Sequence, residues 1–117
     1  MKISGTGRFF HPKNRNGLAY NKEGYPVLNF TLSQSRQKGG RWENSNWLCV
    51  WWGNEENRAY LEKIASEIEN KTKIYVSGTQ WNRSWEYQGR KMYRMEITVE
   101  KFKIVKDEEE LGDDLPL

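Results

Sequence analysis

The sequence predicts an all-β domain in residues 1–105, built as a five-stranded barrel with one α-helix, followed by a short acidic tail in residues 106–117. Two observations predict this class. Short segments in which apolar and polar residues alternate are separated by stretches rich in Gly, Asn and Ser, which is typical of half-buried strands. A single segment has the apolar spacing of an amphipathic helix, and it lies between the third and the fourth of these strands.

Strands are expected at residues 3–10, 27–33, 47–52, 73–79 and 92–105. Gly5 and Gly7 indicate a bend or a bulge in the first strand. The third strand is apolar on both faces, so it is either a central strand or one whose second face is a binding surface. Residues 37–44 and 82–91 contain glycines and polar residues, and they are predicted to be turn-rich connections.

The helix is expected to begin after Asn54, which can cap it, and to end near Asn70. Glu55 and Glu56 suit the positive end of the helix dipole. The apolar stripe of this helix consists of Leu61, Ile64, Ala65 and Ile68. The order of three strands, a helix and two further strands suits a Greek-key barrel of the OB-fold type, with the helix between strands 3 and 4.

Tryptophan is frequent for so polar a chain, with six Trp among 117 residues that are only 36% hydrophobic. A small barrel interior holds few large rings, so some indoles are expected on the surface, where flat aromatic faces usually bind something. Cys49 is the single cysteine and lies in an apolar run, which predicts a buried free thiol. No signal-peptide core or membrane span is recognisable, which predicts a soluble, cytoplasmic protein without a membrane partner.

Charge divides the chain into two parts. Residues 106–117 contain one Lys and six acidic residues, a net charge of −5, whereas the preceding residues contain 18 basic and 10 acidic residues, a net charge of +8, which gives +3 for the whole chain. The chain ends in Asp113, Asp114, Leu115, Pro116 and Leu117. A basic body suits nucleic acid, and an acidic end with an apolar tip suits contact with other proteins. The alternative is a solvated, disordered tail, the commonest state of a charge run.

The residue inventory argues against catalysis. His11 is the only imidazole and Cys49 the only thiol, which excludes a zinc site of Cys and His ligands. The one imidazole that could act as the base of a nucleophilic triad lies beside Pro12 in a predicted loop, which argues against such a triad. No Gly-rich phosphate loop is present. Glu96 and Glu100 lie among Lys and Arg on the last strand, where surface ion pairing is the expected role. We therefore expect a binding protein with no catalytic residues, no metal and no cofactor.

Aromatic and basic residues interleave in both predicted connections, and these residues are the candidate nucleic-acid contacts. The first connection contributes Arg36, Lys38, Arg41 and Trp42, and the second contributes Trp81, Arg83, Trp85, Tyr87, Arg90 and Lys91. Bases of a single strand stack on aromatic rings while Lys and Arg hold the phosphates between them. If a strand continues through residues 81–87, its alternate residues share one face. The alternative is a hairpin stabilised by cross-strand aromatic pairs.

The order of these motifs resembles the bacterial-type single-stranded DNA-binding protein (SSB) family. The resemblance rests on Gly7-Arg8-Phe9 with Pro12, residues 24–32, Cys49-Val50-Trp51-Trp52-Gly53, residues 73–78 followed by Arg83-Ser84-Trp85, residues 89–97, and the terminal residues 113–117. It implies sequence-independent binding and protection of single-stranded DNA during replication, recombination and repair. It also implies a homo-oligomer, a tetramer or a dimer, in the cytoplasm of a bacterial or phage-infected cell, associated with the nucleoid.

The family's stacking positions match Trp52 and Trp85, and its backbone-contacting arginine matches Arg83. Trp47 matches less well, because strand alternation places it opposite to Trp52 unless a bulge intervenes. Trp42 is a candidate for the missing ring, and Trp81 and Arg8 complete the predicted contacts. Asp113, Asp114, Leu115, Pro116 and Leu117 correspond to the tip that recruits genome-maintenance proteins.

Three departures from the family favour a phage- or plasmid-encoded relative. The linker before the tip is nearly absent, Leu117 replaces a terminal Phe, and the hairpin at residues 38–44 is short. Two other functions stay open: an RNA-binding or primosome-type accessory protein with the same barrel, and a sugar-binding module whose tryptophans stack on sugar rings. The basic body disfavours the sugar module.

Overall fold

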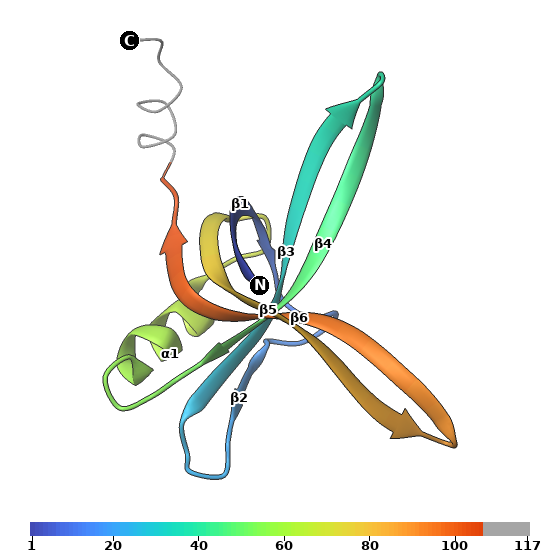
Figure 1. Ribbon diagram of the computed structural model, residues 1–117. Coiled ribbons are helices and arrows are strands. Elements are labelled where there is room, and N and C mark those ends of the chain that lie inside the picture. Colours follow the sequence, from blue (N-terminus) through green and yellow to red (C-terminus); the bar gives the residue numbers. More distant parts are fainter. Residues whose placement is uncertain (107–117) are drawn as a thin grey trace.

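The computed structural model describes residues 1–106, with the side chains of Arg36 and Lys38 excepted. Its elements are β1 (Lys2–Phe10), β2 (Leu18–Tyr20), β3 (Pro26–Lys38), β4 (Arg41–Trp52), α1 (Arg58–Glu67), β5 (Lys73–Tyr87) and β6 (Arg90–Ile104) (Figure 1). The strands follow the order β1-β5-β6-β4-β3-β2 in one sheet, and an additional β1–β3 pairing closes five of them into a ring. The predicted five-stranded barrel, with its helix between the third and fourth barrel strands, is confirmed.

β1 closes the barrel because it changes partner along its length. It pairs with β5 from Lys2 to Arg8 and with β3 from Arg8 to Phe10. At Gly7 a Cβ atom would lie 2.6 Å from the backbone oxygen of Ser33, so only glycine fits this close approach. The irregularity in strand register lies elsewhere, between β5 and β6 at Ser77 and Gly78.

Aromatic contacts fill the barrel, and α1 covers one side of it. The rings of Phe9 and Phe30 stack with their centroids 5.0 Å apart, and those of Trp51 and Phe102 stack at 4.8 Å. The predicted helical stripe is confirmed, since Leu61, Ile64, Ala65 and Ile68 are all buried. Cys49 is a buried free thiol, as expected. No helix within residues 1–106 is long and apolar enough to cross a membrane.

The bounds of the predicted helix were wrong at both ends. α1 begins at Arg58, and its N-cap residue is Asn57, which makes no capping hydrogen bond with its side chain. Oδ1 of Asn54 accepts hydrogen bonds from the backbone N–H groups of Glu56 and Asn57, so Asn54 stabilises a turn that precedes the helix. At the other end Ile68 is extended, which stops the helix before the expected Asn70.

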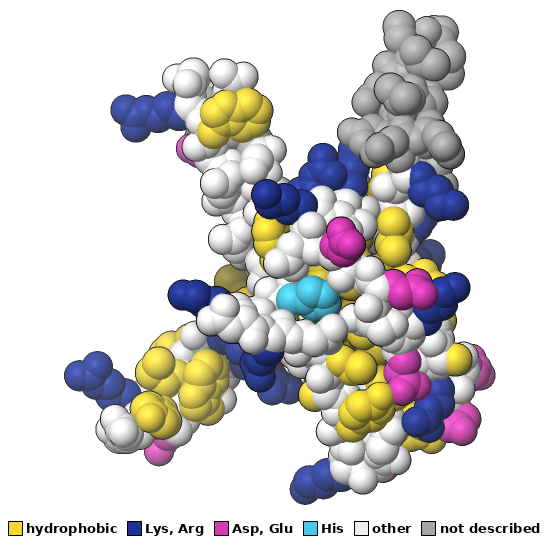
Figure 2. Space-filling view, turned by 180° about the vertical axis from the view of Figure 1, so that it is seen from behind, with side chains coloured by type: hydrophobic (Ala, Val, Ile, Leu, Met, Phe, Trp, Pro, Cys, Tyr) yellow, Lys and Arg dark blue, Asp and Glu magenta, His cyan; other side chains and the backbone are white. Residues whose placement is uncertain are grey.

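Two long hairpins project from the barrel, and we name them the first arm (residues 33–46 of β3 and β4) and the second arm (residues 81–95 of β5 and β6) (Figures 1 and 2). The prediction of turn-rich connections at 37–44 and 82–91 was wrong. Pairing continues to Lys38 opposite Arg41 and to Tyr87 opposite Arg90. Only Gly39-Gly40 and Gln88-Gly89 turn, all with positive φ, which is the two-residue turn that suits twisted hairpins.

The first arm is mostly polar on both faces and does not pack against a core, so periodicity did not indicate a strand there. In the second arm the residues from Trp81 to Tyr87 alternate, and the strand does continue through them. The short β2, which pairs with β3 at the opposite end of the barrel from the first arm, was also missed.

Candidate nucleic-acid interface

Register along β4 sorts its tryptophans onto two faces. Trp51 points into the barrel and is 7% exposed, whereas Trp52 points outward and is 45% exposed. Pairing with β3 is unbroken from Trp52, opposite Val27, to Trp47, opposite Leu32. Trp47 therefore lies on the inner side, as strand alternation without a bulge requires. The outer side of β4 carries Trp42, Asn44, Asn46, Leu48, Val50 and Trp52, and of these Val50 is buried.

One face of the second arm carries an exposed strip of aromatic and basic side chains. Its members are Trp81, Arg83, Trp85 and Tyr87 on β5 and Arg90, Met92 and Arg94 on β6. The four β5 residues share this face, as their alternation predicted for a continuing strand. Each of the three β6 residues lies directly opposite one of them across the ladder. The rings stand out from the surface, with Trp81 55% exposed and Trp85 43% exposed.

The outer side of β4 and the strip on the second arm form one continuous surface, which we name the outer face. β4 and β6 run parallel, with Leu48 paired to Glu96, and Glu96 is in turn paired to Trp81 across the β5–β6 ladder. Paired residues point to the same side of a sheet, so these three side chains form one row. The row therefore connects β4 with β5 and β6 next to the inner ends of the two arms.

Glu96 is the buried charge in this row. The residue is 5% exposed, and its carboxylate lies 3.1 Å from Nε of Arg83 and 2.8 Å from Nη2 of Arg94. The expectation of surface ion pairing holds for Glu100, which binds Nζ of Lys2 and accepts a hydrogen bond from the Thr79 hydroxyl at 3.2 Å. The hydrogen bond from Lys2 lowers the pKa of Glu100. For Glu96 the expectation of a surface residue was wrong, because the contact of β4 with β6 buries it.

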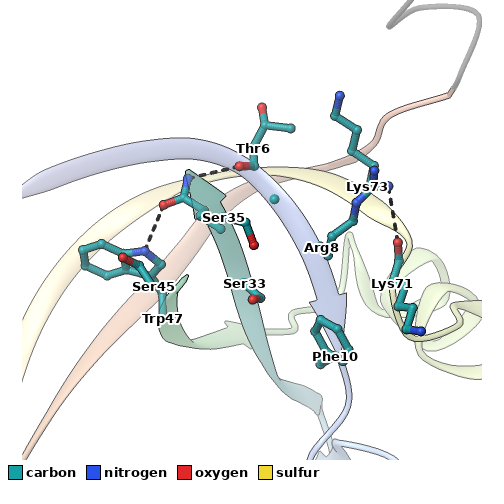
Figure 3. A pocket seen from close by; sticks show the side chains of 11 residues that line it. Thr6, Arg8, Phe10, Ser33, Ser35, Ser45, Trp47, Lys71 and Lys73 are labelled. Atoms are coloured by element: carbon teal, nitrogen blue, oxygen red, sulfur yellow. Dashed lines mark hydrogen bonds between the residues drawn. The ribbon is translucent and has the colours of Figure 1, made fainter. Parts of the chain in front are cut away.

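Trp47 borders a second surface, an open groove of about 1300 Å³ between β1 and the base of the first arm (Figure 3). Its Nε1–H donates to Oε1 of Gln34 at 3.1 Å, and Nε2 of Gln34 donates to the backbone oxygen of Thr6 at 3.0 Å. Three basic residues line the groove, namely Arg8, Lys71 and Lys73. Four hydroxyl side chains join them, those of Thr6, Ser33, Ser35 and Ser45.

The remaining predicted residues are distributed around the arms. Trp42 lies near the tip of the first arm, 70% exposed and on the same side of β4 as Trp52, about 33 Å of strand away. Arg41 lies on the other side of that strand, and Arg36 pairs with Glu43 along the ladder. Lys91 lies on the reverse face of the second arm, with Nζ 5.8 Å from the centre of the Tyr93 ring.

The predicted protein-interaction tip, residues 113–117, lies outside the described residues. Sequence reasoning missed Met92, Arg94 and Glu96 on the outer face and Lys71 in the groove. The alternation of Met92, Arg94 and Glu96 along the last strand is the signal that could have found the first three.

Within residues 1–106 no three His, Cys, Asp or Glu side chains are grouped so that they could hold a metal ion. Burial raises the pKa of the Cys49 thiol to about 12, so the thiol stays protonated and unreactive at neutral pH. The ring of His11 packs edge-on against Phe9 and its Nε2–H donates to the backbone oxygen of Ile68 at 3.0 Å.

No model of a known protein family matches the sequence, and no curated protein is detectably similar to it. The structure is similar to that of the Plasmodium falciparum SSB in its complex with ssDNA, with a TM-score of 0.73. The two chains are 15% identical, and the similarity covers 90% of this chain and 94% of the other. At this level of identity the similarity establishes the fold. The chain is therefore an OB-fold barrel of the kind found in that SSB.

Proposed function

We propose that this protein binds single-stranded DNA without sequence preference, with the bases stacked on the outer face. The observation that carries the proposal is the set of exposed rings of Trp52, Trp81 and Trp85 on one continuous sheet surface, with Arg83 and Arg94 between them. Aromatic stacking contributes about 1–3 kcal/mol per base and tolerates every base, because each base has a π-face. Trp42 extends the same side of β4 to the tip of the first arm.

Phosphates are the natural partners of the basic residues. The body of the chain has a net charge of +8, and Lys and Arg side chains lie over the barrel between the bases of the two arms (Figure 2). Acidic side chains gather mostly on the side of α1 (Figure 2). We assign Arg83 and Arg90 to the phosphates that cross the second arm, and Arg8 and Lys71 to those that enter the groove. Arg36, Arg41 and Lys91 belong to the same set, as cations of the two arms.

Trp47 has a smaller role in this proposal. Its ring is half-buried and its N–H already donates to Gln34, so little of the indole is left to stack on a base. The similar Plasmodium falciparum SSB structure is a complex with ssDNA, which supports ssDNA over RNA as the ligand proposed here. Competition between matched DNA and RNA oligomers tests that choice, and a preference for RNA would replace it.

The wider role rests on the sequence resemblance. We propose a homo-oligomer, a tetramer or a dimer, that protects exposed strands during replication, recombination and repair in a bacterial or phage-infected cell. The terminal residues 113–117 are proposed to bind partner proteins. Equilibrium sedimentation tests the oligomeric state.

Intrinsic tryptophan fluorescence tests the binding proposal. The protein is titrated with dT oligomers at low and at high salt, and a duplex of equal length serves as the control. Saturable quenching by dT that weakens with salt is expected, because stacked indoles are quenched and phosphate contacts release counterions. If quenching is absent, or if the duplex gives an equal response, the tryptophans serve the core and a subunit interface and do not stack on bases. Either result would refute the proposal.

A further inference from the structure

Glu96 places a carboxylate within the surface proposed to bind DNA, where its negative charge would repel the phosphates, so its presence needs an explanation. Glu96 is 5% exposed, and each of its two oxygens holds a different arginine, Arg83 at 3.1 Å and Arg94 at 2.8 Å. Resting on the proposed function, we infer that Glu96 is a positioning residue for DNA binding. It fixes the guanidinium groups of Arg83 and Arg94 among the tryptophan rings, and it does not touch the DNA itself.

The strand register explains how one acid reaches both arginines. Arg83 and Arg94 face each other across the β5–β6 ladder, one row further along the second arm than the pair of Trp81 and Glu96. Both side chains therefore reach back along their strands toward the barrel, where Glu96 accepts from them. A buried carboxylate is costly unless its oxygens are paired, so the arrangement holds all three side chains together.

Because Glu96 orders the two arginine side chains before a ligand binds, less conformational entropy is lost on binding. An arginine side chain has many rotamers, and ordering it upon binding costs affinity. Here the planar guanidinium groups of Arg83 and Arg94 are ordered before the ligand arrives, although the side chains are still 59% and 44% exposed. Such planes can stack on bases and donate to phosphates at the same time.

The ordered arginines are most important at the fork, the place where the two arms diverge from the sheet. Arg94 and Glu96 line a cleft of about 390 Å³ between β4 and β6, together with Asn46 and Leu48 from β4. A strand that passes from Trp52 to Trp81 on the outer face has to cross this fork. The guanidinium of Arg94, fixed at the cleft, is then placed under the crossing nucleotide.

The inference and simple electrostatics predict opposite results for Glu96→Gln. This change removes one negative charge from the protein, and by charge alone it should tighten binding to DNA. If Glu96 positions the arginines, the change should weaken binding, most clearly at about 1 M salt, where the Debye length of about 3 Å leaves little long-range attraction.

Glu100→Gln is the matched control. It makes the same change of charge on the same strand, but the ion pair that it breaks is with Lys2, away from the arginines. The assay is anisotropy of a labelled dT oligomer. Glu96→Gln is expected to bind about tenfold more weakly than the wild type, as is typical of residues in one ion-pair network, and Glu100→Gln to bind as tightly or more tightly. Equal behaviour of the two variants would overturn the inference.

A mutant cycle between Glu96 and the two arginines together separates a positioning role from a merely structural one. In the Arg83→Gln, Arg94→Gln background, Glu96→Gln should have no further effect on affinity, because no arginine is left to hold. A loss that persists in that background would overturn the inference. If Glu96→Gln does not fold, Glu96→Asp keeps the charge and shortens the side chain, and it should also weaken binding, whereas wild-type affinity would contradict the inference. Failure of the proposed function looks different, since then the wild type itself does not bind dT.

Discussion

Trp51 and Trp52 are neighbours in the chain but lie on opposite faces of β4, so alanine substitutions at the two positions separate packing from DNA contact. Trp51 is 7% exposed, and its ring stacks on Phe102 at 4.8 Å and meets the edge of Tyr60 at 5.9 Å. Trp51→Ala should cost about 3–5 kcal/mol of folding free energy, the usual range for a buried aromatic ring. Small domains have only about 5–15 kcal/mol in total, so the variant should be close to unfolding.

Trp52→Ala should behave in the opposite way. The residue is 45% exposed on the outer face, so its removal leaves no cavity and should cost about 1 kcal/mol of stability or less. Loss of one stacked base should cost about 1–3 kcal/mol of binding free energy. At about 1.4 kcal/mol per tenfold change, this is a rise in Kd of about 5- to 150-fold.

Two assays on the same samples decide the matter. Thermal unfolding followed by circular dichroism reports stability, and anisotropy of a labelled dT oligomer reports affinity without depending on the number of tryptophans. Trp52→Ala with normal stability and reduced affinity is the expected result. Wild-type affinity for Trp52→Ala would refute the reasoning, and so would a folded Trp51→Ala variant that loses affinity to the same extent.

Three further predictions concern the groove, the thiol and the irregular register of β5 and β6 at Gly78. Arg8→Gln should reduce the slope of log K against log salt by about 0.7, the value for one lost phosphate contact on a single strand, and an unchanged slope would remove Arg8 from the interface. Cys49 has its pKa raised by burial from 9.0 to about 12, so at pH 8 a thiol reagent should label it only in denaturant, and stability should fall as the pH rises above about 9. Gly78→Ala should destabilise the fold by about 1–3 kcal/mol in chemical denaturation, because its Cβ would lie 2.0 Å from the backbone oxygen of Thr98; a neutral result would mean that the strand can shift there.

Alternation along the chain predicted most of the barrel strands, because these strands are buried on one face, whereas the third predicted strand is apolar on both faces and was identified by its apolar run. Phe30 and Leu32 face the core while Thr31 and Ser33 do not, and the helical stripe around Leu61 and Ile64 is as clear. The arms could not be predicted in this way. The first arm has no continuous apolar face to mark a strand, and the alternating aromatic residues of the second arm lie on a face that meets solvent and not a core.

The candidate site was predictable to the extent that it depends on local spacing. Trp81, Arg83 and Trp85 share a face because strands alternate, and this needs no knowledge of the fold. Burial of Glu96 depends instead on the parallel pairing of β4 with β6, which joins residues far apart in the sequence. In the sequence, most of the charged residues near Glu96 are Lys and Arg, which suggested ion pairing at the surface.

Photocrosslinking tests most directly the central claim that single-stranded DNA lies on the outer face. An oligomer of dT with bromodeoxyuridine in place of some thymidines is bound and irradiated, and the modified residues are identified by mass spectrometry. Adducts on Trp52, Trp81 or Trp85 are predicted, since these rings are exposed on that face. Adducts confined to the helix side, at Tyr25 or Tyr60, would contradict the account.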